Sequence, residues 1–161
     1  MQKKGFVLTE VVGALAILCV ITALCGSQIV KLFTSWQNMQ IDVQLFDAGR
    51  YMLTKMEREI SLNAVKIYVQ DNKIQMQTKQ GSKEIVIRYN DEVAGLYQDT
   101  TTNLGTGTNP LFIRDCLVNN WEVKKIEDKK LRVNFDLTKA GRKKTFARIF
   151  YVLNGVVEDE K

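Results

Sequence analysis

The feature that most constrains this chain is an apolar run over residues 11–25, interrupted only by Gly13 and Thr22. About 20 helical residues, each rising 1.5 Å, cross the roughly 30 Å hydrocarbon core of a bilayer. The wider apolar stretch, residues 6–30, is long enough for one crossing. We therefore expect residues 6–30 to form a transmembrane helix.

One carboxylate, Glu10, stands at the edge of this apolar run. An acidic side chain costs from ~2.5 kcal/mol upward at the centre of a bilayer and less toward the interface. An ordinary secretory signal peptide carries its charges before the apolar segment, as Lys3 and Lys4 are placed here. A signal peptide and a plain signal-anchor helix both leave Glu10 unexplained, so we expect a compensating partner for it.

The leader Lys3-Lys4-Gly5 is followed by Phe6, and Glu10 stands four residues after this Phe. The arrangement resembles the class III signal of type IV pilin-like proteins. The resemblance implies that a prepilin peptidase removes residues 1–5 by cutting between Gly5 and Phe6. It also implies that the new amino terminus, Phe6, is N-methylated.

The helical spacing gives Glu10 a partner of the right charge. Residues four apart lie on one face of a helix, so the Phe6 amine and the Glu10 carboxylate can meet, within one helix or between neighbouring subunits. Such a pair offsets the desolvation of both charges. It is better evidence for the register between packed helices than for a net gain in stability. We expect Glu10 to act as an assembly residue that meets a neighbour's amino terminus.

The helical pattern continues beyond the apolar run. No proline lies between residues 29 and 62, and apolar residues advance by three or four at Ile41, Leu45, Ala48 and Met52. We expect residues 31–63 to form an amphipathic helix that continues the transmembrane helix into a soluble domain. By the positive-inside rule the amino terminus is cytoplasmic, so this domain is expected outside the cytoplasm, anchored by a single pass through the inner membrane.

After Asn63 the period changes to two, which is typical of half-buried strands. Residues 64–155 are predicted to form an antiparallel β domain, with a three-stranded meander first and then a second small sheet or an extension of the first. Residues 99–110 lack periodicity and are expected to form an exposed loop, and residues 156–161 a flexible tail. The predicted fold class is α+β, a long N-terminal helix packed on antiparallel sheets. The strands are expected near residues 65–70, 74–77, 85–88, 121–126, 131–137 and 145–153.

This layout resembles the larger minor pilins and pseudopilins, most closely the J-type pseudopilin of type II secretion and the W-type minor pilins. The resemblance implies a subunit of a type IV pilus, a type II secretion pseudopilus or a competence pseudopilus, placed at its tip. The implied partners are the prepilin peptidase, other pilin subunits, an inner-membrane assembly platform and, before assembly, lipid. The residues that carry this resemblance are Arg58-Glu59-Ile60, 85–89, 95–97 and Asn154-Gly155.

Two other functions remain open at this point. The first is a single-pass, membrane-anchored extracytoplasmic binding domain that is neither cut nor polymerised. The second is an adhesin or DNA receptor that uses the filament as a stalk. A basic cluster is the candidate for contact with DNA phosphates, but no aromatic residues for base stacking interleave with it, so a solvated hairpin turn is the simpler interpretation and no nucleic-acid partner is expected. The cluster consists of Lys139, Arg142, Lys143, Lys144 and Arg148.

The sequence contains no histidine, which excludes Ser-His and Cys-His nucleophile pairs and histidine-based metal sites. We expect no enzymatic activity, no cofactor and no metal. Four carboxylates offer oxygen ligands for Ca²⁺ but lack a spaced loop motif, so solvated turns are the simpler interpretation. Cys116 is expected to be a small buried apolar residue. The four carboxylates are those of Asp91, Glu92, Asp99 and Asp115.

Overall fold

The computed structural model describes residues 8–70, 72–79, 83–111 and 115–159. Helix α1 (Leu8–Glu57) has 50 residues and leads directly into the π-helical segment η1 (Arg58–Asn63). The long N-terminal helix predicted from the apolar run and the three-and-four spacing is therefore confirmed. The predicted leader, residues 1–5, and Phe6 lie outside the described residues.

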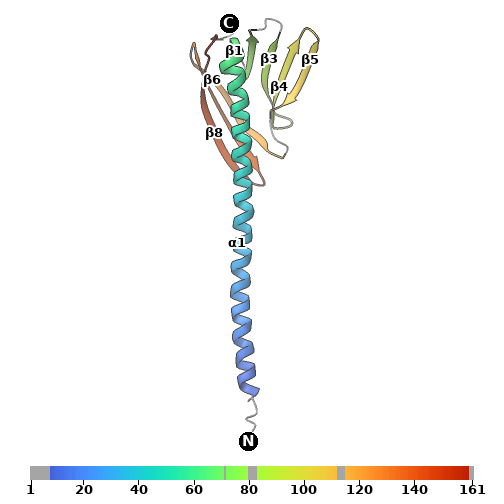
Figure 1. Ribbon diagram of the computed structural model, residues 1–161, viewed down its shortest axis with the longest axis vertical. Helices are drawn as coiled ribbons and strands as arrows, with labels where there is room; N and C mark the ends of the chain where they lie inside the picture. The colour runs from blue at the N-terminus through green and yellow to red at the C-terminus, as the bar shows by residue number, and fades with distance from the viewer. Residues whose placement is uncertain (1–7, 71, 80–82, 112–114, 160–161) are drawn as a thin grey trace. The chain divides into compact units, whose positions relative to one another are not determined.

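The described strands form two sheets (Figure 1). The first has six strands in the order β5-β4-β3-β2-β1-β9, and the second has three in the order β6-β7-β8. All neighbours pair antiparallel except β1 and β9, which are parallel. The result is the predicted α+β architecture, which is consistent with a pilin-like fold. The strands are β1 (Ala64–Gln70), β2 (Lys73–Thr78), β3 (Glu84–Asn90), β4 (Gly95–Thr102), β5 (Gly105–Pro110), β6 (Leu117–Glu127), β7 (Lys130–Lys139), β8 (Arg142–Tyr151) and β9 (Val156–Asp159).

The loop predicted over residues 99–110 is wrong. Strands β4 and β5 occupy this stretch and pair in unbroken register from Tyr97↔Pro110 to Thr102↔Gly105. Every residue of β5 is exposed, so its two faces do not differ in polarity and no period-two pattern appears in the sequence. The threonines of this stretch favour extended backbone even where nothing apolar is buried.

The flexible tail predicted from residue 156 is also wrong, because β9 occupies residues 156–159. Val157 is fully buried and pairs with Ile67 of β1. The preceding Gly155 permits this close approach, since a Cβ there would lie within 2.8 Å of the carbonyl group and Cα of Val65. Four residues ending in acidic side chains were too short to show a strand pattern.

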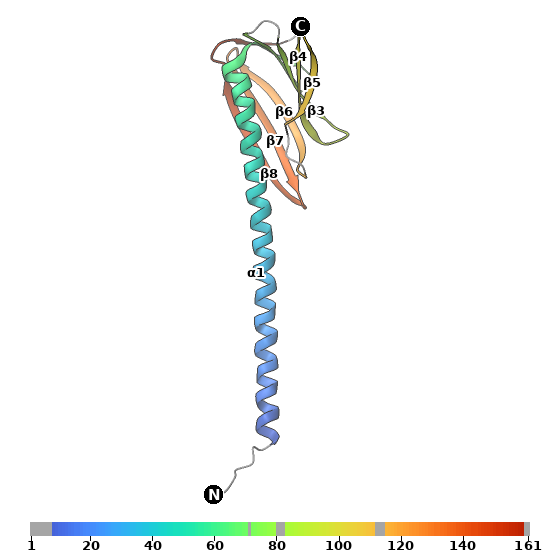
Figure 2. The same cartoon turned by 45° about the vertical axis from the view of Figure 1, so that its right-hand side comes forward.

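Residues from Ile41 onward form one compact unit with a single core. Figures 1 and 2 both show this part of α1 running along the β6-β7-β8 sheet. The helix contributes Leu45, Ala48, Met52 and Met56, each at most 1% exposed, to the core that also includes apolar residues of both sheets. A helix stripe and two sheet faces thus bury one another, as a layered domain requires.

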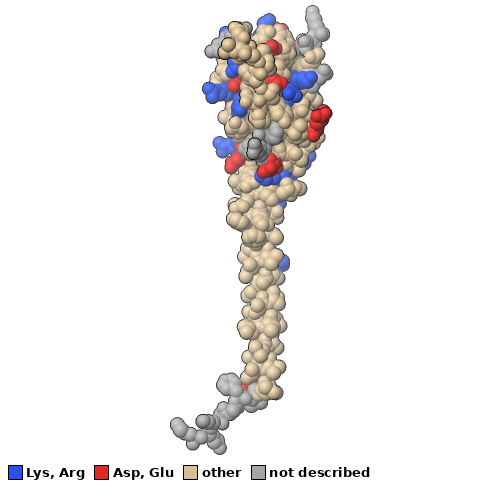
Figure 3. Space-filling model, turned by 90° about the vertical axis from the view of Figure 1, so that its right-hand side faces the viewer, with Lys and Arg blue, Asp and Glu red and all other residues tan. Residues whose placement is uncertain are grey.

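The earlier part of α1, from Leu8 to Gln40, belongs to a separate unit. Every side chain in this stretch is exposed. Figure 3 shows it as a surface almost without charge, whereas the charged side chains gather on the other unit. Its apolar surface therefore has no protein partner within the described part of the chain.

Candidate functional site

Glu10 lies in the first turn of α1, with exposed Leu8, Val11 and Val12 beside it in the sequence. The large side chains next to Glu10 are apolar. Among the described residues of the first turns of α1, no basic side chain is present to pair with this carboxylate. The predicted cleavage residues, Gly5 and Phe6, lie outside the described residues, so the geometry of a pair between Phe6 and Glu10 is not described.

The helical stretch Leu8–Asn63 is long and apolar enough to cross a membrane, and none of its most apolar 18-residue window is buried. This is compatible with a single-pass membrane anchor. Lys31 is followed by two exposed aromatic residues, Phe33 and Trp36, whose ring centroids are 5.9 Å apart. Aromatic and basic side chains of this kind are enriched where a helix leaves the hydrocarbon core.

Two arginines of the predicted basic cluster join β8 to α1. Arg142 donates from Nε to Asp42 Oδ1 at 2.7 Å and from Nη2 to Asp42 Oδ2 at 2.5 Å. The hydrogen bond from Arg142 lowers the pKa of Asp42, against a smaller opposing effect of burial. Arg148 donates from Nη2 to Glu57 Oε1 at 2.5 Å. Both guanidinium groups are therefore engaged with carboxylates of the same domain.

The lysines of the cluster have different surroundings. Lys143 forms an ion pair with Asp136 at 2.7 Å, and Lys144 Nζ lies 4.8 Å from the centre of the Phe46 ring. Lys139 has no ion-pair partner among the described residues. The structure brings Lys139, Arg142, Lys143 and Lys144 together around the β7–β8 turn and leaves Arg148 further along β8.

Asp136 is the buried acceptor of a polar network, with 4% of its surface exposed. Thr145 Oγ1 donates to its Oδ1 at 2.6 Å, and Asn120 Nδ2 donates to its Oδ2 at 2.5 Å. Burial raises the pKa of Asp136, but the hydrogen bonds from Lys143, Thr145 and Asn120 together outweigh it and hold the pKa below its ordinary value. No local pattern in the sequence points to this network.

The carboxylates considered for Ca²⁺ do not form a metal cluster in the described part of the chain. Asp99 instead accepts from Arg88 Nε at 2.5 Å and from Thr108 Oγ1 at 2.7 Å. Burial raises the pKa of Asp99, and these two hydrogen bonds lower it further than burial raises it. Cys116 is 3% exposed, as expected, and burial raises the pKa of its thiol.

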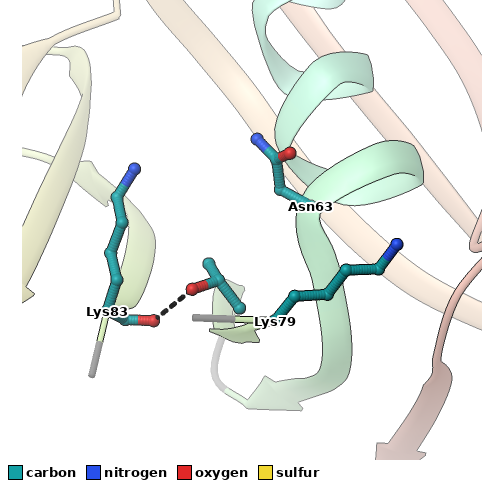
Figure 4. Close-up of a pocket in the computed structure, with 4 residues that line it drawn as sticks. Asn63, Lys79 and Lys83 are labelled. Carbon is teal, nitrogen blue, oxygen red and sulfur yellow. Dashed lines mark hydrogen bonds between the residues drawn. The ribbon is translucent and has the colours of Figure 1, made fainter. Parts of the chain in front are cut away.

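Two polar pockets were considered as ligand sites. One of about 300 Å³ is lined by Asn63, Thr78, Lys79 and Lys83 (Figure 4). The hydroxyl of Thr78 donates to the Lys83 carbonyl at 2.9 Å, and the amide of Lys79 donates to the Asn63 carbonyl at 3.3 Å. Figure 4 shows the two lysine side chains extending in different directions, so their ammonium groups do not converge on one point.

The other pocket, of about 610 Å³, lies beside the turn before β2 and the start of β6. Its aromatic residues serve the fold, since Trp121 Nε1 donates to the Asn72 carbonyl at 2.5 Å and the Tyr89 hydroxyl to the Val118 carbonyl at 3.0 Å. Trp121 is 5% exposed, which leaves little of its ring for stacking on a ligand.

Comparison with known proteins gives no match: no family model, no curated protein and no solved structure is detectably similar to the chain.

Two structural residues were missed by sequence reasoning. Gly49 lies under the ring of Phe146, where a Cβ would lie within 2.6 Å of three ring carbons. The spacing indicated that Gly49 is buried, because it falls on the same helical face as Leu45 and Met52. Phe146, whose ring contacts Gly49, lies on β8 almost 100 residues later, and no local pattern identifies it as the partner.

Proposed function

We propose that this chain is a minor pilin or pseudopilin that is anchored in the cytoplasmic membrane and then assembles into a filament. The observation that supports the proposal is the division of α1 into two parts. Residues 8–40 expose apolar side chains on all sides, whereas the later residues bury one stripe against antiparallel sheets. A helix that is apolar all round needs lipid or other helices around it.

Glu10 distinguishes an assembling subunit from a simple anchor. A carboxylate flanked by apolar side chains is unfavourable in lipid, and a neighbouring subunit's free amine compensates for it. In this proposal the prepilin peptidase cuts after Gly5, Phe6 becomes the N-methylated terminus, and Glu10 meets that terminus on an adjacent subunit. The J-type and W-type resemblance further suggests a place at the filament tip, in a type IV pilus or in a secretion or competence pseudopilus.

The proposed partners are the peptidase, other pilin subunits and an inner-membrane assembly platform. The β domain lies outside the cytoplasm in this proposal, and the chain has a structural role rather than an enzymatic one.

The intact mass and N-terminal peptide of the protein, purified from its own host's membranes, test the proposal. We expect a chain that starts at N-methylated Phe6. A start at Met1 would favour the uncut, membrane-anchored binding domain instead. A start near Ser27 or Gln28 would identify a conventionally secreted protein and contradict the role given to Glu10.

Glu10→Ala should leave cleavage intact while reducing the amount of the protein in sheared filaments at least about tenfold, a change equivalent to about 1.4 kcal/mol. Thr9→Ala is the matched control, because it alters the neighbouring position without removing a charge. Normal incorporation of the Glu10 variant would contradict the assembly role, whereas loss of cleavage in both variants would indicate a processing defect.

A further inference from the structure

The end of the second sheet, where β7 turns into β8, carries a group of cations on one face. The register pairs Lys139 with Arg142 and Leu137 with Lys144. Side chains of a strand alternate between faces, so Lys139, Arg142 and Lys144 share one face of this hairpin. That face is turned toward α1, since Arg142 bonds to Asp42 and Lys144 lies over Phe46.

Two of the cations at the hairpin end form ion pairs and two do not. Arg142 is paired with Asp42, and Lys143, on the opposite face, is paired with Asp136. Lys139 and Lys144 form no ion pair among the described residues, although Lys144 lies near enough to Asp42 to help lower the pKa of that carboxyl. The hairpin end therefore carries two lysine ammonium groups without an ion pair.

Exposed apolar side chains of α1 lie next to these charges. Phe46, under Lys144, is 44% exposed, and Val43, one turn earlier, is 50% exposed. Arg50 Cζ also lies 6.0 Å from the centre of the Phe46 ring. Basic side chains beside exposed apolar ones are typical of protein surfaces that rest on anionic membranes.

The chain itself limits how far this surface can be from the membrane, given the proposed single-pass anchor, on which this inference rests. Lys31 is followed by no charged residue until Asp42. Trp36 is suited to the headgroup region, and Asp42 follows it by six positions, which is at most about 22 Å of fully extended chain. The hairpin bonded to Asp42 is therefore tethered within short reach of the headgroups, which raises their effective concentration at its end.

We propose that the end of the β7–β8 hairpin binds the phosphate headgroups of anionic lipids through Lys139 and Lys144, in the bilayer that holds α1. The anchor supplies the lipid at high effective concentration, so two lysines suffice. A DNA duplex is the less suitable partner, because both lysines are half-buried and Lys144 lies near the carboxylate of Asp42, whereas a duplex requires a row of open phosphate contacts.

The test uses the full chain in nanodiscs of phosphatidylcholine alone or mixed with phosphatidylglycerol. Ala140→Cys in the turn is labelled with a membrane-impermeant fluorophore, and lipids with a nitroxide on the headgroup quench it. The unsubstituted chain reports any labelling of Cys19, Cys25 or the buried Cys116. The test variant is Lys139→Gln/Lys144→Gln, and the matched control, Lys124→Gln/Lys129→Gln, removes the same charge near the opposite end of β6 and β7.

We expect stronger quenching in the anionic discs, lost at high salt. The ratio of lipid-bound to free hairpin should fall about fivefold for each lysine removed in the test variant and remain unchanged in the control. Equal quenching in both lipids, or an unchanged test variant, would overturn the proposal. The lysines would be assigned to nucleic acid instead if quenching did not depend on the lipid and if the unsubstituted chain bound a short DNA duplex that the test variant did not bind. A chain that fails to enter the discs would refute the anchor itself, which is a different outcome from an anchored chain without lipid preference.

Discussion

Replacing Gly49 with alanine should destabilise the β domain, although the same change stabilises an ordinary helix. Glycine in a helix interior is less favourable than alanine by about 1 kcal/mol. Here the added Cβ would lie within 2.6 Å of Cε1, Cζ and Cε2 of Phe146, and ordinary contact begins at 3.4 Å. Cε1 and Cζ are the nearest, at 2.2 Å, so the ring must move by about 1.2 Å to reach ordinary contact.

The ring has little freedom to move. Phe146 is 8% exposed and stacks on Phe135, with ring centroids 5.4 Å apart, and Phe135 in turn contacts Trp121 at 6.2 Å. Overpacking of a well-packed core costs roughly 1–3 kcal/mol. Because three ring carbons are met at once, the cost lies in the upper part of this range, about 2–3 kcal/mol, and the helix regains about 1 kcal/mol. The free energy of unfolding should therefore fall by about 1–2 kcal/mol.

Urea denaturation of the full chain in mild detergent, followed by near-ultraviolet circular dichroism, measures this change. Thr54→Ala is the control, since Thr54 is exposed on the same helix and should gain a few tenths of a kcal/mol from helix propensity alone. In a Phe146→Ala background the sign should reverse, and Gly49→Ala should then stabilise by about 1 kcal/mol. A stabilising Gly49→Ala with Phe146 intact would refute the reasoning.

Two further predictions concern β9 and the buried network. Gly155→Ala should release β9 from β1, because the added Cβ would meet the Val65 backbone, which cannot move aside as a side chain can. The measurement is amide hydrogen exchange at Val157, which should become faster. Gly107→Ala is the control, because the space around Gly107 is open and the exchange rate should not change. Asp136→Asn should destabilise the domain at pH 7, with a deficit that shrinks as the pH falls. The folded-state pKa of Asp136 is lowered, so its contribution is complete above the unfolded pKa of about 3.9 and is lost as the pH falls through the folded value. Denaturation at neutral pH and near pH 3 compares the two states, and an equal deficit at both would contradict the ionised role.

The sequence predicted the helix and those strands that have one buried apolar face and one exposed polar face. The change from three-and-four spacing to period two at Asn63 coincides with the end of η1, because helix and strand both bury one face. Strand β5 was not predicted because neither of its faces is buried. Strand β9 was not predicted because a single buried residue, Val157, cannot show an alternating pattern. Hydrogen bonding to β4 and β1 forms both strands, and that pairing is not encoded in their own polarity.

The basic cluster shows a different limit. Five cations close together in the sequence suggested one surface, yet Arg142 and Arg148 reach Asp42 and Glu57 on α1, about 100 residues earlier. Ion pairs of this kind depend on which strand lies along the helix, which no local pattern reveals. Lys139 and Lys144 at the hairpin end are left without an ion pair among the described residues, and only the structure distinguishes them from the other cations of the cluster.

The environment of α1 supplies the last argument for an assembling subunit over a permanent anchor. From Leu8 to Gln40 no side chain is buried, so lipid or other helices must cover this surface. For the leucines and valines the two environments are nearly equivalent, since lipid tails are as apolar as packed side chains. For Glu10 they are not, because lipid leaves its carboxylate uncompensated, whereas in the proposed filament a neighbouring subunit would bring an amine to the same face. A permanent anchor gains nothing from this carboxylate, and a subunit that leaves lipid for a filament gains a specific position in it.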